Sequence, residues 1–169
     1  MKKITLCVIA MVAFVGTMVA ALPITKVDRV NPTDEIFMEM AIDQAKESVA
    51  EGGLPCGASV VKSNRMLGVG QATEKATAEE TAIAMTRKKN LGFAIVYTIN
   101  EPTAEAYNAI CRAGVESVVF VNSREEVIAK GVYPAEAYDE ALVDTTLTKV
   151  PMTQLDNASA TAVLKNWKK

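Results

Sequence analysis

The residues of this chain that could do chemistry are few, because the sequence contains no histidine. Without an imidazole there is no Ser-His or Cys-His nucleophile, no histidine general base and no histidine metal ligand. The thiols outside the apolar N-terminus are Cys56 and Cys111, and proton transfer would fall to carboxylates such as Glu79. The sequence therefore excludes several common hydrolase and metal-site arrangements at once.

The two cysteines are expected to be structural. Both would enter an oxidising compartment if the chain is exported, whereas Cys7 lies in the N-terminal apolar segment. The sequence does not give the separation of Cys56 and Cys111, so a disulfide between them is left open. We expect two small buried side chains instead. For Cys56, a buried structural thiol is favoured over a nucleophile because no histidine can activate it.

Helix-like and strand-like runs alternate along the chain and define the elements that must position these groups. Asn31-Pro32 suits a helix N-cap followed by the first helical residue. The expected helices are 34–51, 77–89, 102–112, 123–130 and 158–168, and the expected strands are 54–61 and 66–72 (a hairpin), 94–99, 117–121 and 150–155. This order predicts one α/β domain with a mixed sheet and helices on both faces.

Four stretches, in this order, resemble the cytidine deaminase-like superfamily, and in particular its branch of guanine deaminases and nucleobase or tRNA adenosine deaminases. They are FMEMAIDQAKESVAEGGLPCGASVV, TAEETAI, NEPTAEAYNAICRAGVESVVFV and VPMTQLDNASATAVLKNWKK. Cys56 stands at the Phe of that family's Gly-x-Pro-Phe-Gly-Ala strand. The resemblance implies a three-layer α/β/α sandwich with a mixed central sheet.

The sequence departs from the family at the zinc site. The resemblance implies a zinc ion held by His or Cys in H-x-E and by both cysteines of P-C-x-x-C, with the Glu carrying protons. These ligand positions hold Thr77, Thr103 and Ala106, whereas the proton-carrying position is still Glu79. A neutral hydroxyl does not replace a thiolate or an imidazole, and alanine offers no ligand. We therefore expect no zinc cofactor. The family's base-binding Asn aligns with Ala72.

The retained acids have a structural interpretation. Thr77 and Glu80 fit a capping box, and Glu79 suits the positive end of the helix that follows. Pro102 as the first helical residue and Glu105 in the first turn are ordinary helix-start choices. We favour these interpretations over Glu79 as a remnant catalytic acid or base. Cys56, Ala72 and Glu105 remain candidates for lining the pocket.

The N-terminus has the composition of an export signal. Two lysines lead an uncharged apolar run, and Val19-Ala20-Ala21 supplies the small residues of a cleavage site. We expect a signal peptide at 1–21, a linker at 22–30 and a deaminase-like domain at 31–169, with the protein periplasmic or extracellular. The alternative is an uncleaved membrane anchor, because the run is just long enough to span a bilayer.

These observations favour an exported, catalytically inactive deaminase-fold protein (a pseudo-deaminase) with a binding or structural role. The alternative is a nucleobase or nucleoside deaminase with a different site, for which Asp34, Glu79 and Glu105 would be the evident oxygen ligands. Free helix N-termini suit a small polar ligand, which the sequence does not identify. No basic run suggests nucleic acid. A homodimer is expected from the resemblance, with no stable membrane association after signal cleavage.

Overall fold

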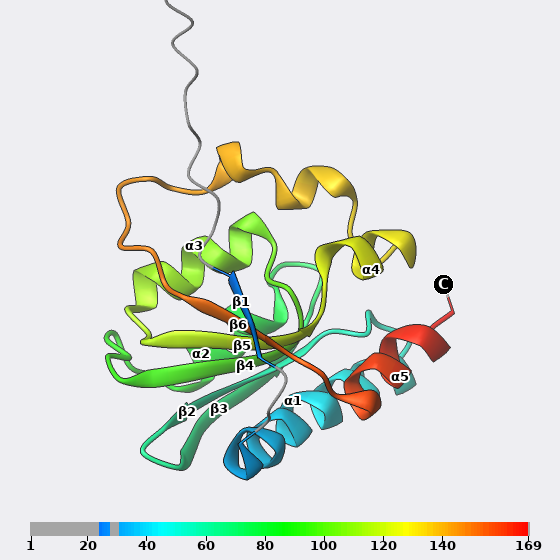
Figure 1. Cartoon of the computed structure of the whole chain (residues 1–169), viewed down its shortest axis with the longest axis horizontal. Helices are drawn as coiled ribbons and strands as arrows, with labels where there is room; N and C mark the ends of the chain where they lie inside the picture. The colour runs from blue at the N-terminus through cyan, green and yellow to red at the C-terminus, as the bar shows by residue number, and fades with distance from the viewer. Residues whose placement is uncertain (1–23, 28–30, 169) are drawn as a thin grey trace, which may run out of the picture.

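The computed structural model describes residues 24–27 and 31–168, which form a six-stranded sheet with helices on both faces (Figure 1). The strand order is β1-β6-β5-β4-β2-β3. The first four strands in this order are mutually parallel, and β2 is antiparallel to both of its neighbours, β4 and β3. The strands are β1 (Ile24–Val27), β2 (Gly57–Lys62), β3 (Arg65–Gln71), β4 (Ala94–Asn100), β5 (Ser117–Asn122) and β6 (Met152–Leu155). The helices are α1 (Pro32–Ala50), α2 (Ala78–Met85), α3 (Ala104–Ala113), α4 (Arg124–Ala129) and α5 (Ala158–Asn166), with short 3-10 helices at Ala135–Tyr138 and Glu140–Leu142. The expected α/β sandwich with a mixed sheet is confirmed.

Each face of the sheet carries its own apolar core. Alternate residues of β5 separate the two cores, because successive side chains of a strand point to opposite faces. Val118 and Phe120 pack in the core that includes residues of α2 and α3. Val119 and Val121 pack in the core that includes residues of α1 and α5. Strand β5 therefore contributes side chains to both cores, and helices lie on both faces of the sheet (Figure 1).

Several expected local features are confirmed. Asn31 caps α1 by accepting from the Thr33 N–H, and Pro32 is its first residue. The hairpin turn between β2 and β3 lies at Ser63 and Asn64, whose φ angles are 50° and 57°. Two consecutive positive φ angles are the mark of the type I′ turn, which matches the twist of a hairpin.

Within the segment 22–30, which was expected to be a linker, Ile24–Val27 instead forms β1 and pairs with β6 in parallel at the edge of the sheet. This strand is too short to show strand periodicity, and backbone pairing with a distant segment holds it in place. The signal peptide expected at 1–21 lies outside the described residues. Within the part of the chain that is described, no helix has the length and apolar character needed to cross a bilayer.

Two helix boundaries also differ from expectation. The helix expected from Pro102 begins at Ala104, because the Thr103 hydroxyl accepts from the Ala106 N–H and makes Thr103 the N-cap. The helix expected to run to Lys89 ends at Met85, shortly before Arg87 takes a φ of 55°.

The packing of α2 on β3 is a direct contact between backbones. A Cβ atom added at Gly70 would lie 2.4 Å from the Ala82 nitrogen and 2.7 Å from the Ala78 oxygen. Only glycine allows this approach, since the atoms it would meet belong to the helix backbone and cannot rotate away. Gly70 therefore sets the position of the N-terminal turn of α2, where Thr77 and Glu79 lie.

We expect Gly70→Ala to lower the free energy of unfolding by about 1–3 kcal/mol, the usual cost of forcing extra volume into a packed interior. Urea denaturation measures this loss. Gly92→Ala is the matched control, because the added methyl would meet only the Asn90 side chain, at 3.2 Å. Equal losses in the two variants would contradict the close contact at Gly70.

Candidate functional site

A small closed cavity lies where β4 ends and where α2 and α3 begin. Its volume is about 10 Å³, close to the minimum for a single water molecule and far below the roughly 300–1,000 Å³ of clefts that take drug-sized ligands. The side chains around it are mostly polar. The lining residues are Cys56, Thr77, Glu79, Thr98, Asn100, Glu101, Thr103 and Tyr133.

Two threonine hydroxyls in the lining close the N-terminal ends of the two helices. Thr77 Oγ1 accepts from the Glu80 N–H at 3.3 Å, and Glu80 accepts in return from the Thr77 N–H at 2.9 Å. This confirms the expected capping box. Thr103 Oγ1 accepts from the Ala106 N–H at 3.3 Å. Both hydroxyls are thus engaged with helix backbone.

Glu79 is buried, with 6% of its surface exposed. It lies in the first turn of α2, as expected, but it lines the cavity and does not face solvent. The Thr98 hydroxyl donates to its Oε1 at 2.6 Å. Burial raises the pKa of Glu79, and the hydrogen bond from Thr98 offsets part of that rise. The environment therefore destabilises the carboxylate form of Glu79 relative to a glutamate in water.

Cys56 contributes a protonated thiol. It is buried and free, and so is Cys111, as expected. Burial raises the pKa of Cys56 to about 12, and hydrogen bonds with Tyr133 and Asn100 only partly oppose that rise. The thiolate is the nucleophilic form of cysteine, so Cys56 is inert at neutral pH in this environment.

Two asparagines lie at the ends of β4 and β5, and one of them, Asn100, lines the cavity. Asn122 Nδ2 donates to Asn100 Oδ1 at 3.0 Å and to the Ile99 carbonyl at 2.8 Å. Asn100 Nδ2 donates to the Pro55 carbonyl at 2.9 Å. The sequence analysis missed this pair, although both apolar runs, VYTIN and VVFVN, end in asparagine at the same register position.

The loop from β4 to α3 is fixed by a buried ion pair that the sequence analysis also missed. Arg124 Nε donates to Glu101 Oε1 at 2.7 Å, and the Arg124 backbone N–H donates to Oε2 at 2.9 Å. Only 4% of the Glu101 side chain is exposed. The Arg124 guanidinium also lies 5.8 Å from the Tyr138 ring centroid. The segment after α4 is thereby attached to the cavity wall, to which it contributes Tyr133.

The structure brings together only some of the candidates from the sequence. Cys56, Thr77, Thr103 and Glu79 share the cavity, and Ala106 is buried one turn into α3 without lining it. Glu105 is exposed to solvent. Ala72 lies along a separate open hollow with Leu54 and Thr73.

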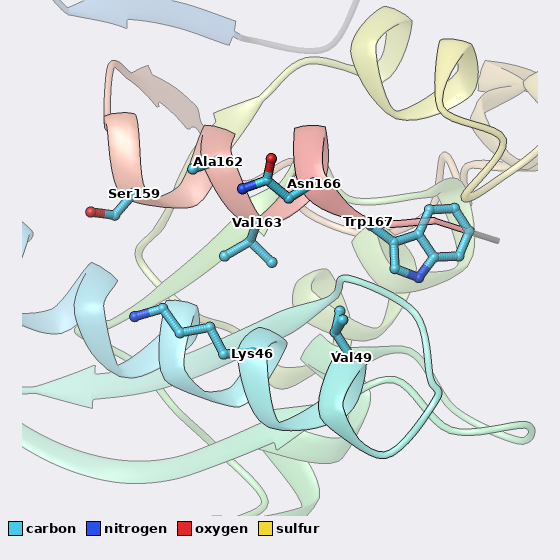
Figure 2. A pocket seen from close by; sticks show the side chains of 7 residues that line it. All are labelled: Lys46, Val49, Ser159, Ala162, Val163, Asn166 and Trp167. Carbon is cyan, nitrogen blue, oxygen red and sulfur yellow. The ribbon is translucent and has the colours of Figure 1, made fainter.

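A larger hollow, of about 420 Å³, lies between α1 and α5 (Figure 2). It is mainly apolar, with Val49, Val163 and Trp167 among its walls. Its one charged side chain, Lys46, is paired with Glu39 and Asp43 at 3.2 and 3.3 Å. No acid or thiol lines it, so it lacks the groups of a catalytic site.

Comparison with known proteins places this geometry in context. Residues 31–122 match the family described as the cytidine and deoxycytidylate deaminase zinc-binding region. No curated protein sequence matches the chain. Among solved structures, guanine deaminase from Nitrosomonas europaea is similar, with a TM-score of 0.63 and 20% identity over 82% of this chain and 85% of that chain.

Two further solved structures show the same fold. Guanine deaminase from Bacillus subtilis has a TM-score of 0.59 and 25% identity, covering 83% of this chain and 99% of its own. A tRNA:A34 deaminase, which carries out A-to-I editing at the wobble position of transfer RNA, has a TM-score of 0.62 and 20% identity, covering 76% of this chain and 99% of its own.

The burial of Glu79 predicts a particular pH dependence for Glu79→Gln. Below the ordinary carboxyl pKa of 4.5, the acid is protonated in the folded and the unfolded chain. Above it, the unfolded chain loses the proton while the folded chain retains it, so the wild type loses stability as pH rises. Glutamine stays neutral. The stability of Glu79→Gln relative to wild type should therefore increase as the pH rises above 4.5, and it should level off once the carboxyl group of the folded chain also ionises.

Urea denaturation of both proteins at several pH values measures this difference. Glu105→Gln removes a carboxylate from the same turn of α3, but at an exposed position, and is the matched control. A relative stability of Glu79→Gln that falls with rising pH would show that Glu79 is ionised in the folded protein.

Proposed function

The chain belongs to the family of the cytidine and deoxycytidylate deaminase zinc-binding region, and we propose that it is an exported member without zinc-dependent deamination, serving a binding or structural role. One observation carries this proposal. Two of the three positions that align with zinc ligands, Thr77 and Thr103, are helix caps, the third is Ala106, and the space that a metal and a base would share is closed to about 10 Å³.

The donor set does not fit zinc. Zinc in proteins takes thiolate, imidazole or carboxylate ligands in tetrahedral geometry. Thr77 and Thr103 present neutral hydroxyls that already accept from helix backbone, and Ala106 presents a methyl group. Among the residues that the structure describes, no group of three or more His, Cys, Asp or Glu side chains could hold a metal ion. We therefore derive no reaction step through zinc.

The acids of the alternative, non-standard site do not converge. Asp34 accepts from the Tyr97 hydroxyl at 2.7 Å, and Tyr97 packs in the core on the α1 face of the sheet. Glu79 lies in the closed cavity near the starts of α2 and α3, and Glu105 faces solvent. No pair of these carboxylates is placed to share a metal or a water molecule.

The cavity suits a small polar occupant. The starts of α2 and α3 carry partial positive charge, and the Glu79 carboxyl group and the Thr98 hydroxyl supply hydrogen-bonding groups. A volume of about 10 Å³ holds one water molecule, which would bridge these groups. Such a water would stabilise the fold and would not by itself perform deamination, because nothing in this donor set lowers its pKa.

Two elements of the proposal rest on the sequence alone. Residues 1–21 have the composition of a cleaved export signal. The C-terminal stretch from Val150 resembles that of guanine deaminases, which supports a homodimer as the structural role. Sizing at several protein concentrations tests the dimer, and a panel of guanine, adenine, cytosine and their nucleosides tests for residual deamination.

The replaced ligands predict that protein purified without chelator holds well under one zinc per chain by elemental analysis. Thr77→His with Thr103→Cys and Ala106→Cys restores the family's donor set, and this variant should take up about one zinc, because Thr77 and Thr103 line one cavity and Ala106 lies one turn from Thr103. Thr77→His alone is the control, since a single ligand does not hold zinc. A full equivalent of zinc in dialysed wild-type protein would contradict the proposal.

The signal predicts cleavage after Ala21, because Val19 and Ala21 are the small residues that a signal peptidase reads. N-terminal sequencing of protein isolated from its natural host should begin at Leu22. Val19→Arg should block processing and leave the precursor as the only species. An intact Met1 in wild-type protein from the membrane fraction would support the anchor instead.

A further inference from the structure

The end of the sheet opposite the closed cavity combines exposed apolar side chains with cations. The cavity lies where β4 ends, whereas this other end lies where β4 begins (Figure 1). It comprises the tip of the β2–β3 hairpin, the last residue of α2 with the residues that follow it, and the residue before β4. We call it the basic end: Lys62, Arg65, Met66, Met85, Arg87, Lys88, Lys89 and Phe93.

Phe93 is the most unusual residue of the basic end. Its ring is 78% exposed, and its φ is 63°. A bulky residue is rarely found at positive φ, because the conformation is strained and persists only where the surroundings impose it. Burial gives no compensation here. The Lys62 ammonium lies over the Phe93 ring, 5.8 Å from its centroid, so an aromatic ring and a cation lie next to each other on this surface.

The other apolar members come from adjoining elements. Met66 is 47% exposed and Met85 is 60% exposed. Met85 lies at the C-terminal end of α2, and this helix packs on β3, the strand that contains Met66. With Phe93, they make up half of the six large apolar side chains that are exposed in the described part of the chain.

The cations of the basic end form no ion pair with an acid among the described residues. Arg65, Arg87, Lys88 and Lys89 are exposed, and Lys62 is half-buried. The ion pairs between described residues involve other cations: Lys26, Lys46 and Arg124. One exposed acid, Glu116, lies nearby, since its N–H donates to the Ala94 carbonyl. The chain as a whole carries a net charge of −2, so these cations are concentrated on an otherwise acidic molecule.

We propose that the basic end docks on the surface of an anionic lipid bilayer. Phe and Met side chains enter the boundary between headgroups and acyl chains, while Lys and Arg around them pair with lipid phosphates. This chemistry explains an exposed phenyl ring held at positive φ beside unpaired cations. A nucleic acid would use several aromatic side chains for stacking, and the basic end has one.

The path of the chain is consistent with this orientation. Strand β1 runs parallel to β6, β5 and β4, so it enters the sheet at the same end at which β4 begins. The first described residue, Ile24, is therefore on the side of the sheet that carries the basic end. The docking does not depend on the catalytic state of the cavity, because the two sites lie at opposite ends of β4.

The test measures co-sedimentation with vesicles, using a chain that starts at Leu22 and so retains every described residue without the apolar run. Vesicles of equal parts phosphatidylglycerol and phosphatidylcholine should bind the protein, and pure phosphatidylcholine vesicles should bind it far less. Binding should weaken as salt is raised, because the attraction is screened. Arg65→Glu with Lys88→Glu should reduce partition by at least about tenfold.

Phe93→Gly separates docking from folding. Glycine relieves the positive φ, so the Tm of this variant should equal or exceed that of wild type. Its partition to the anionic vesicles should nevertheless fall by about fivefold or more, because the phenyl ring that would enter the bilayer is lost. A loss of partition with a higher Tm is an outcome that misfolding does not produce.

Matched controls lie elsewhere on the surface. Ile36→Ala removes an exposed apolar side chain from α1, and Lys75→Glu with Lys168→Glu reverses two exposed cations outside the basic end. Both should partition like wild type. The proposal is overturned if wild type binds the two vesicle types equally or not at all, or if the basic-end variants bind like wild type. Binding of a single-stranded oligonucleotide, lost in the same variants and without vesicle binding, would assign the basic end to nucleic acid.

Discussion

The structure depends on how two helix N-termini satisfy their free backbone N–H groups inside the protein. Both α2 and α3 begin at the closed cavity, where the first-turn N–H groups have no intrahelical acceptors. Thr77 and Thr103 supply side-chain oxygens that accept from the third helical N–H of each helix. Two of the three positions that align with the family's zinc ligands are therefore capping positions in this chain. Threonine at these positions is compatible with the fold, because a cap needs only one side-chain oxygen at the start of each helix. A zinc site instead needs thiolate, imidazole or carboxylate ligands from several positions.

Closure of the cavity follows from the polar groups around it. Buried polar groups are costly unless they are hydrogen-bonded, and those that line this cavity bind one another. Glu101 is neutralised by Arg124, Asn100 is held by Asn122, and Glu79 accepts from Thr98. These bonds connect β4, β5, α2 and α4 across the site. Opening the cavity for a nucleobase would break several of them, which supports a binding or structural role.

The two ends of β4 differ in kind. At the carboxyl end, side chains are buried and mutually bonded. At the amino end, Phe93 is exposed at a positive φ, and the cations around it form no ion pairs among the described residues. The same sheet thus separates a buried, hydrogen-bonded region from a surface that combines exposed apolar side chains with cations.

The sequence by itself determined the order of the elements from α1 to α5, the N-caps at Asn31 and Thr77, the hairpin turn and the replacement of the zinc ligands, because each depends on neighbouring residues or on side-chain chemistry alone. Only the tertiary structure decided that Glu79 is buried and that Glu105 is not, although both lie in first helical turns. The pairing of β1, the Asn100–Asn122 bond and the Glu101–Arg124 pair were likewise decided by strand register and helix packing. These contacts join residues far apart in the chain, and local pattern carries no information about which distant segments become neighbours.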